Sequence, residues 1–281
     1  MKTVNTISET RDLINSIKIQ GKTVGFVPTM GALHDGHITL IREARKENNF
    51  IVCSIFVNPI QFNNPNDLKN YPREIEKDIK KLVEAKCDLL FHPSVEEMYP
   101  EPDNTIFDFG DLDKVMEGAF RPGHFNGVAV VVKKLFEIVT PHRAYFGMKD
   151  YQQLVIIHQL TKDYEIPVEI VPCTTVREKD GLAMSSRNQL LSKSERKIAP
   201  IIYETLKLVK VQSGYATISE LKDFVHDQFR KHKNMKLEYF EIVDMYTLKS
   251  IRTWADSRTA IACIAVYLGN VRLIDNIILF S

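Results

Sequence analysis

The sequence predicts an α/β fold, in which a doubly wound parallel sheet is followed by a smaller C-terminal α+β domain. Extended apolar runs alternate with helical patterns over roughly the first 175 residues, and the alternation then gives way to a different pattern. Strands alternating with helices of this length form right-handed βαβ units, with helices on both faces of a parallel sheet. We expect the first domain to span residues 1–176 and the second, a lid domain, residues 177–281.

Five extended segments predict the strands of the first domain. The segment from Phe50 to Val57 is an almost continuous apolar run, as is typical of a strand buried on both faces. The other four are shorter and lie between helical patterns. The five predicted strands are residues 23–27, 50–57, 88–91, 143–146 and 168–171.

Helical periodicity separates these strands. It is clearest at residues 128–139, where apolar residues recur at i, i+3, i+4, i+7, i+8 and i+11 before Pro141 ends the helix. Further helices are predicted at residues 37–48, 75–83, 111–117 and 151–164.

The pattern changes after a charged turn at residues 177–181, which suits a domain boundary. Two helices are predicted beyond it, at about 193–212 and 218–231, and strands at 237–243 and 260–268. Gly269-Asn270 indicates a hairpin to a last strand that starts at Val271, with a helix as the alternative for that segment.

The composition is that of an ordinary globular protein, with 44% hydrophobic and 26% charged residues among 281. A net charge of +1 creates no field that would gather nucleic acid. No apolar run reaches the roughly 18 residues expected of a membrane span. We therefore expect neither nucleic acid nor a membrane as a partner. The first residues lack an apolar signal core, which predicts a cytoplasmic protein.

The four cysteines are Cys53, Cys87, Cys173 and Cys263. They are widely spaced along the chain, and Cys53 and Cys263 lie in apolar runs. Metal ligation and a disulfide framework are the alternatives, but this spacing favours reduced residues that pack in the core.

Polar loops directly follow four of the predicted strands. They are residues 30–37, 58–62, 147–153 and 174–187. Because the carboxyl ends of parallel strands meet at one edge of a sheet, we expect the four loops to share a site there.

The loop at residues 30–37 has the outline of a phosphate site. Gly31 and Gly36 allow a close backbone approach, and the following helix start offers free N–H groups. His34 and His37 lie three residues apart, without the additional ligands that a zinc site needs. Each could be a hydrogen-bonded structural residue, but two histidines flanking a glycine at this turn favour a functional role.

Each remaining loop has a structural and a functional interpretation. Asn58 can simply end a strand, whereas Gln61 is an amide in apolar company that needs partners if it is buried. Lys149 and Asp150 can form a solvated helix start. The cluster at residues 185–187 can be a helix cap, or its two hydroxyls and guanidinium can clamp an anion.

Five ordered motifs resemble the pantothenate synthetase family, the pantoate–β-alanine ligases. They occupy residues 28–37, 56–62, 121–125, 145–153 and 184–188, and the resemblance extends to residues 273–276. It implies a Rossmann-like fold and membership of the nucleotidylyltransferase superfamily, whose His-x-Gly-His motif class I aminoacyl-tRNA synthetases share. Met148 departs from the pattern, since glutamate is usual at that position.

The resemblance implies an ATP-dependent ligase that joins (R)-pantoate to β-alanine through a pantoyl adenylate and releases pyrophosphate and AMP. This is the pantothenate-forming reaction of vitamin B5 and coenzyme A biosynthesis. ATP, pantoate and β-alanine are the implied partners, and Mg²⁺ is the implied cofactor, held mainly by triphosphate oxygens. The resemblance also implies a homodimer.

Site residues follow from the same resemblance. It assigns catalytic roles to His34, His37, Lys149 and Arg187, pantoate to Gln61 and Gln153, and the border of the β-alanine position to Gln61. No side chain is implied as a metal ligand. The implied ATP-binding residues are Met30, Gly31, Ala32, Leu33, His34, Asp35, Gly36, His37, Gly147, Met148, Lys149, Asp150, Val176, Met184, Ser185, Ser186 and Arg187.

Two other functions stay open at this point. A nucleotidylyltransferase of the same superfamily would stop at an adenylylated product. A nucleotide-sensing or RNA-binding module would carry out no chemistry, although the near-zero charge argues against RNA.

Overall fold

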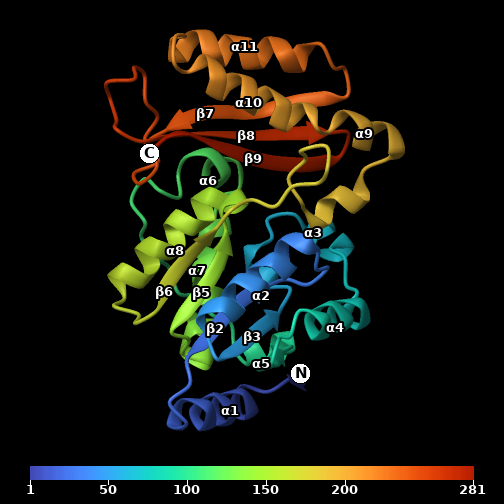
Figure 1. Cartoon of the computed structure of the whole chain (residues 1–281), viewed down its shortest axis with the longest axis vertical. Coiled ribbons are helices and arrows are strands. Elements are labelled where there is room, and N and C mark those ends of the chain that lie inside the picture. The colour runs from blue at the N-terminus through green and yellow to red at the C-terminus, as the bar shows by residue number, and fades with distance from the viewer. The chain divides into compact units, whose positions relative to one another are not determined.

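The computed structural model describes residues 1–281, which form two compact units (Figure 1). The first unit comprises Met1–Met148 and Gln152–Thr174, and the second comprises Lys149–Tyr151 and Thr175–Ser281. The division after Thr174 lies two residues before the predicted one. The assignment of Lys149–Tyr151 to the second unit was not predicted from the sequence.

The first unit is built on a six-stranded sheet in the order β1-β4-β3-β2-β5-β6, in which every pairing is parallel. The chain runs outward from β2 to β3 and β4, and then returns to place β5 on the other side of β2. This reversal is the switch point of a doubly wound sheet, so the predicted fold class is confirmed. The strands are β1 (Lys2–Val4), β2 (Val24–Thr29), β3 (Phe50–Ile55), β4 (Leu89–Phe91), β5 (Arg143–Gly147) and β6 (Glu169–Cys173).

Helices cover both faces of this sheet, as neighbouring residues of β2 show. Val27 belongs to a core that includes Ile41 of α2 (Asp35–Glu47) and Leu82 of α4 (Ile75–Glu84). The ring of Phe26 lies instead 6.3 Å from that of Phe136 in α7 (His124–Val139). Because successive strand residues face opposite sides, α2 and α4 lie on one face and α7 on the other.

The other helices of the first unit are short, apart from α1 and α8. The structure contains α1 (Ile7–Ile19), α3 (Pro65–Asn70), α5 (Val95–Met98), α6 (Met116–Phe120), α8 (Tyr151–Asp163) and the 3₁₀ turns η1 (Pro59–Gln61) and η2 (Met148–Asp150). Strand β1 and helix α1 were not predicted. Among the residues of α1 only Thr10 and Ile14 are buried, so the helix has no broad apolar stripe to reveal it. No helix of the chain is long and apolar enough to cross a bilayer.

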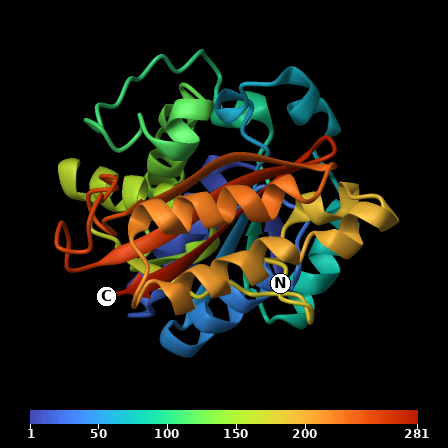
Figure 2. The same cartoon turned by 90° about the horizontal axis from the view of Figure 1, so that it is seen from above.

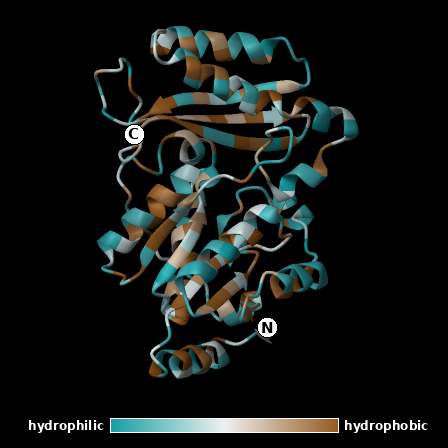
Figure 3. Cartoon of the chain, in the orientation of Figure 1, coloured by the Kyte–Doolittle hydropathy of each residue, from teal (hydrophilic) through white to brown (hydrophobic).

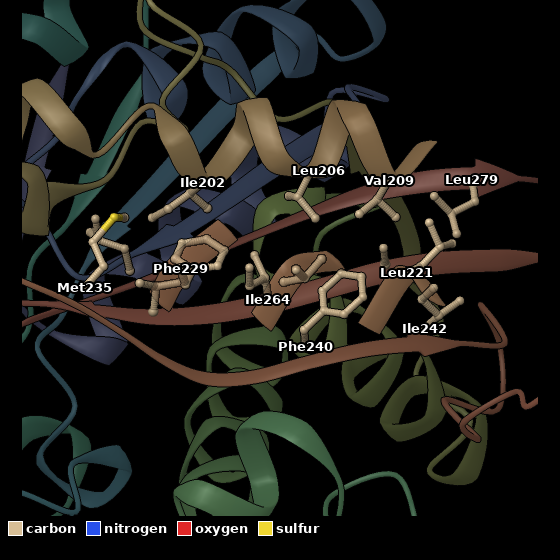
Figure 4. Packing of buried hydrophobic residues seen from close by; sticks show 14 of the residues in the cluster. Ile202, Leu206, Val209, Leu221, Phe229, Met235, Phe240, Ile242, Ile264 and Leu279 are labelled. Carbon is tan, nitrogen blue, oxygen red and sulfur yellow. The ribbon is translucent and has the colours of Figure 1, made fainter. Parts of the chain in front are cut away.

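The second unit is an antiparallel sheet with helices packed on it. Its strands are β7 (Met235–Val243), β8 (Ala260–Leu268) and β9 (Val271–Phe280), with β8 in the centre. Strands β8 and β9 form the predicted hairpin, so the helical alternative for the last segment is wrong. Helices α10 (Ile201–Gln212) and α11 (Ile218–Arg230) lie across the strands (Figure 2). Figure 4 shows how Leu206, Phe229, Phe240 and Ile264 meet in the core between them.

One helix prediction in this unit needs correction. The helix expected at 193–212 is divided into α9 (Lys193–Ile198) and α10, because Pro200 has no N–H to continue the hydrogen bonding. In Figure 3, hydrophilic and hydrophobic stretches alternate along α10 and α11. The four cysteines are buried, as expected of residues that pack in the core.

Candidate active site

The loop after β2 is shaped by a buried carboxylate. Gly31 (φ 82°) and Ala32 (φ 48°) both adopt left-handed backbone conformations, which are uncommon for alanine. Asp78 of α4, only 2% exposed, accepts hydrogen bonds from the N–H of Ala32 at 2.8 Å and of Leu33 at 2.7 Å. Lys81 of the same helix donates to the carbonyl of Leu33. Helix α4 therefore fixes the path of the loop.

Asp78 was not singled out from the sequence, although a signal was present. It lies three residues after Ile75 and four before Leu82, within the apolar stripe of α4. A carboxylate among core positions must find partners. Burial raises the pKa of Asp78, and the hydrogen bonds from Leu33 and Ala32 act against that rise.

His34 and His37 form a reciprocal cap at the N-terminus of α2. Nδ1 of His34 accepts from the N–H of Gly36, and Nδ1 of His37 accepts from the N–H of His34, each at 3.2 Å. The ring centroids are 4.0 Å apart. Because each Nδ1 accepts from a backbone N–H, the proton of each neutral ring is on Nε2. The cap therefore makes Nε2 of both histidines a donor at the positive end of a helix dipole.

Gln61 follows β3 in η1, and its side chain is buried, 8% exposed. Its amide nitrogen donates to the sulfur of Met30 at 3.1 Å, and its amide oxygen accepts from Asn58 at 3.2 Å. A thioether is a weak acceptor, so a ligand oxygen would be a better partner for this amide. Asn58 also donates to the carbonyl of Gly127 at 3.0 Å and accepts from Tyr99. It therefore joins η1 to α7 rather than merely ending a strand.

The motif at residues 121–125 also supports Gln61. Nε2 of His124 lies 3.1 Å from a guanidinium nitrogen of Arg121, and Nδ1 lies 2.9 Å from the carbonyl oxygen of Gln61. A guanidinium can only donate, so His124 accepts on Nε2 and donates from Nδ1 to Gln61. The sequence motif was more than a turn, because this buried histidine holds the backbone of η1.

The two adjacent glutamines at the start of α8 have different surroundings. The buried amide of Gln152 is fully engaged, since it donates to the carbonyls of Leu112 and Val115 and accepts from the N–H of Glu117. Gln153 is only partly buried. Gln152 therefore holds the segment before α6, and its amide is engaged within the protein.

Lys149 and Asp150 lie in the second unit. The ammonium of Lys149 is 3.4 Å from a carboxylate oxygen of Asp150, and its carbonyl accepts from the side chain of Asn276 at 2.9 Å. The hydroxyl of Tyr151 donates to the carbonyl of Met245 at 3.0 Å. These two hydrogen bonds to β9 and to the segment after β7 explain why 149–151 belongs to this unit.

Residues 176–184 form a tight hairpin. The N–H of Met184 donates to Val176 at 3.0 Å, and that of Glu178 to Leu182 at 2.8 Å. At its tip Gly181 (φ 94°) packs so closely on Tyr203 that a Cβ would lie 2.8 Å from the ring. Only glycine fits there without displacing the ring.

Ser185 caps the 3₁₀ turn η3 (Ser186–Leu190), since its hydroxyl accepts from the N–H of Arg187 at 3.3 Å. The cap interpretation of this cluster is therefore correct. It leaves the hydroxyl of Ser185 able to donate, because the cap uses the oxygen as an acceptor.

The structure distributes the predicted site residues over both units. The first unit contains residues 30–37, Gln61, Gly147, Met148 and Gln153, and the second contains Lys149, Asp150, Val176 and Met184–Arg187. Within the first unit, residues 30–37, Gln61 and Gly147 follow or end β2, β3 and β5, which are neighbouring parallel strands. Their predicted placement at one sheet edge is correct.

A family model for pantoate-beta-alanine ligases matches residues 2–278. The chain belongs to the pantoate-beta-alanine ligase family. This result confirms the resemblance seen in the motifs and the prediction of an enzyme of the ligase class.

Relatives of this ligase family cover almost the whole chain. The pantothenate synthetase of Bacteroides fragilis is 51% identical over 277 residues, which are 99% of this chain and 98% of that protein. The pantothenate synthetase of Caldicellulosiruptor saccharolyticus is 48% identical over 281 residues, 99% of each chain.

Solved structures of the family show the same fold. The pantothenate synthetase of Thermus thermophilus superposes with a TM-score of 0.94 at 44% identity, over 100% of both chains. The pantoate-beta-alanine ligase of Francisella tularensis, complexed with beta-gamma ATP and beta-alanine, gives a TM-score of 0.84 at 38% identity and covers 99% of this chain and 98% of its own.

Proposed function

We propose that this protein condenses (R)-pantoate with β-alanine at the expense of ATP, forming pantothenate, AMP and pyrophosphate through a pantoyl adenylate. Family membership supports the reaction, as does the Francisella relative, which was crystallised with an ATP compound and β-alanine. The observation that carries the site is the reciprocal cap of His34 and His37, which makes both Nε2 atoms donors at a helix N-terminus.

In the first step a carboxylate oxygen of pantoate attacks the α-phosphorus of ATP. An oxygen–phosphorus bond forms, and the bond to the bridging oxygen breaks to release pyrophosphate. No protein nucleophile is required, so catalysis consists of positioning and stabilisation of charge. We assign donation to the α-phosphate oxygens to His37, with His34 donating to a neighbouring phosphate oxygen.

The residues assigned to ATP in this proposal are found in each of the two units. Residues 30–37, Gly147 and Met148 belong to the first unit, and Lys149, Asp150, Val176 and Met184–Arg187 to the second. Lys149 and Arg187 would neutralise phosphate charge, and the hydroxyls of Ser185 and Ser186 would donate to phosphate oxygens.

Gln61 and Gln153 are assigned to pantoate, and Gln61 also to the border of the β-alanine position. The weak hydrogen bond from Gln61 to the sulfur of Met30 supports this role, since a substrate oxygen is a stronger acceptor than a thioether sulfur and could take its place. Neutral amides suit this place. A cation would stabilise the attacking carboxylate and so reduce its nucleophilicity.

In the second step the amine of β-alanine attacks the acyl carbon of the adenylate. A carbon–nitrogen bond forms, AMP leaves with the electrons of the broken carbon–oxygen bond, and the amine loses a proton. Water would hydrolyse the adenylate, so the reaction needs a sheltered site. We propose that the second domain, with its 177–187 loop, acts as the lid that excludes water.

Mg²⁺ is the proposed cofactor. The structure has no group of three or more His, Cys, Asp or Glu side chains that could hold a metal ion. Mg²⁺ would be held mainly by triphosphate oxygens and would neutralise phosphate charge there. We further propose that the protein is a homodimer and acts in the cytoplasm.

Product analysis tests the proposed function. The purified protein should form AMP, pyrophosphate and pantothenate in equal amounts from ATP, pantoate and β-alanine, and omission of pantoate should abolish all three. An adenylylated product that accumulates despite β-alanine would instead identify a nucleotidylyltransferase. Tight RNA retention in low-salt filter binding, without product formation, would identify an RNA-binding module.

A further inference from the structure

We infer that Asp275 and Asn276 of β9 are positioning residues that hold the Lys149 segment and the Val176–Arg187 segment in a fixed arrangement. Both segments belong to the second unit and carry residues that the proposed function assigns to ATP, so the inference rests on that function. Neither Asp275 nor Asn276 has a place in the chemistry proposed above.

Asp275 fixes the start of the 176–184 hairpin through Arg177. The two carboxylate oxygens accept from the two terminal guanidinium nitrogens of Arg177 at 2.6 and 3.0 Å. The same guanidinium donates to the carbonyl of Gly181 at 3.2 Å and lies 3.5 Å from the ring centroid of Tyr203. Arg177 is thus held on one side by β9 and on the other by α10, and the hairpin that leads to Ser185 cannot shift without breaking this arrangement.

Asn276 fixes the Lys149 segment. Its side-chain nitrogen donates to the backbone carbonyl of Lys149 at 2.9 Å, and its own N–H donates to Asp275 at 2.8 Å. The Asn276 side chain is 7% exposed. The hydrogen bond is partly shielded from water, so its loss would be compensated only in part, and it restricts the backbone that carries the Lys149 ammonium.

The two residues are adjacent in a strand that has little freedom to move. Asp275 pairs with Ile264 and Asn276 with Cys263, both on the central strand β8. Hydrogen bonding to β8 therefore holds Asp275 and Asn276, which anchor the two segments, in fixed positions relative to each other. Loop residues without such anchors would lose their alignment with a triphosphate, and small misplacements of these residues strongly reduce the reaction rate.

Another ion pair in the same sheet provides a control. Arg272 of β9 and Glu238 of β7 also form a half-buried guanidinium–carboxylate pair, with side-chain exposures of 16% and 13%. The carboxylate of Glu238 accepts two hydrogen bonds, both from the guanidinium of Arg272 and neither from the two ATP segments. Glu238→Gln therefore weakens a comparable ion pair of the same sheet, and its own carboxylate accepts no hydrogen bond from those segments.

A double-mutant cycle on Asn276 and Lys149 tests the inference. Asn276→Asp keeps the size of the side chain but places an acceptor against the carbonyl of Lys149. We expect it to lower kcat/KM for ATP about tenfold, since one hydrogen bond of about 1.4 kcal/mol corresponds to that factor. In a Lys149→Ala background the same substitution should lower kcat/KM by less than about twofold, because the ammonium that it misplaces is gone.

A general loss of folding would give a different result. If Asn276→Asp lowered kcat/KM about tenfold in both backgrounds, its effect would be independent of Lys149 and the inference would be overturned. Glu238→Gln should keep wild-type kcat/KM, and a tenfold loss there would also overturn it. If Asn276→Asp does not fold, as judged by thermal unfolding, Asn276→Ala takes its place in the cycle. Failure of the proposed function is distinguished by a wild-type protein that forms no AMP at all.

Discussion

Asp78 accepts a 2.7 Å hydrogen bond from the backbone N–H of Leu33, although the two residues are 45 positions apart. The carboxylate also accepts from Ala32, whose φ of 48° is uncommon for a residue with a side chain. A helix remote in sequence thus fixes the loop that ends in the capping histidines. The loop conformation is a property of the folded unit, not of the loop sequence alone.

Replacement of Asp78 should therefore reduce both stability and activity. Asp78→Asn places an amide N–H₂ group against one of two backbone donors, so we expect the free energy of unfolding to fall by about 2 kcal/mol and kcat by roughly tenfold. Chemical denaturation and steady-state kinetics measure the two effects. Glu84→Gln, an exposed residue of the same helix, is the control and should match the wild type. An Asp78→Asn protein with wild-type kcat would mean that the carboxylate is not needed to shape the loop.

His37→Ala should lower kcat by about 10²-fold or more, because it removes a donor to the charge that develops at the α-phosphate. It also removes one side of the reciprocal cap, which should cost about 1 kcal/mol of stability. Kinetics at saturating ATP measure the loss in kcat, and chemical denaturation measures the loss in stability. The exposed His226→Ala in α11 is the control. A folded His37→Ala protein with unchanged kcat would remove His37 from this role.

Gly127→Ala should impair pantoate binding. A Cβ at this position of α7 would lie 2.7 Å from the carbonyl oxygen of Ile60 and 2.8 Å from the backbone nitrogen of Gln61. The substitution must therefore displace η1, and we expect KM for pantoate to rise about tenfold or more, with a loss of about 1–3 kcal/mol in stability. Gly214→Ala is the matched control, because nothing lies within 4 Å of its Cβ. Equal KM values for the two variants would contradict the proposed position of Gln61.

Acid should weaken the second unit through Asp244. Burial acts to raise the pKa of Asp244, but hydrogen bonds from Ser257, Thr247 and Thr259 outweigh it and hold the pKa well below its ordinary value. A carboxyl group whose pKa is lower in the folded than in the unfolded state stabilises the fold at pH values above its unfolded pKa. This stabilisation is lost as the pH falls from the unfolded pKa towards the folded pKa. Unfolding free energies should thus decline below about pH 4.

The test compares Asp244→Asn with the wild type in denaturant titrations across that pH range. The variant should be less stable at neutral pH, by about 1–2 kcal/mol, and should lose less stability below about pH 4. The exposed Asp223→Asn serves as the control. Identical pH dependence of Asp244→Asn and the wild type would show that Asp244 does not make this contribution.

The strands and the helices with strong periodicity could be predicted from the sequence. The apolar run at 50–57 became β3 and the i, i+3, i+4 pattern at 128–139 became most of α7, since burial alone dictates both. Helix α1 could not be predicted, because few of its residues are buried. The break before α10 could be predicted only by giving Pro200 more weight than the helical periodicity around it.

Local patterns located the residues of the candidate site but not what supports them. The His34–His37 spacing and the glycine loop are contiguous in sequence, so they are visible without a structure. The contacts of Asp78 with Leu33, of His124 with Gln61 and of Asn276 with Lys149 join residues 45, 63 and 127 positions apart. Such pairs depend on tertiary structure. Only the Asp78 contact had a signal in the sequence, namely a carboxylate at a position within an apolar helical stripe.

Isotope exchange between pyrophosphate and ATP tests the central claim most directly. We propose that pantoate, bound by Gln61 and Gln153, attacks ATP before β-alanine takes part. Exchange of labelled pyrophosphate into ATP should therefore require pantoate, proceed without β-alanine, and decline about 10²-fold in His37→Ala. Exchange that appeared only when β-alanine was added would contradict the adenylate mechanism.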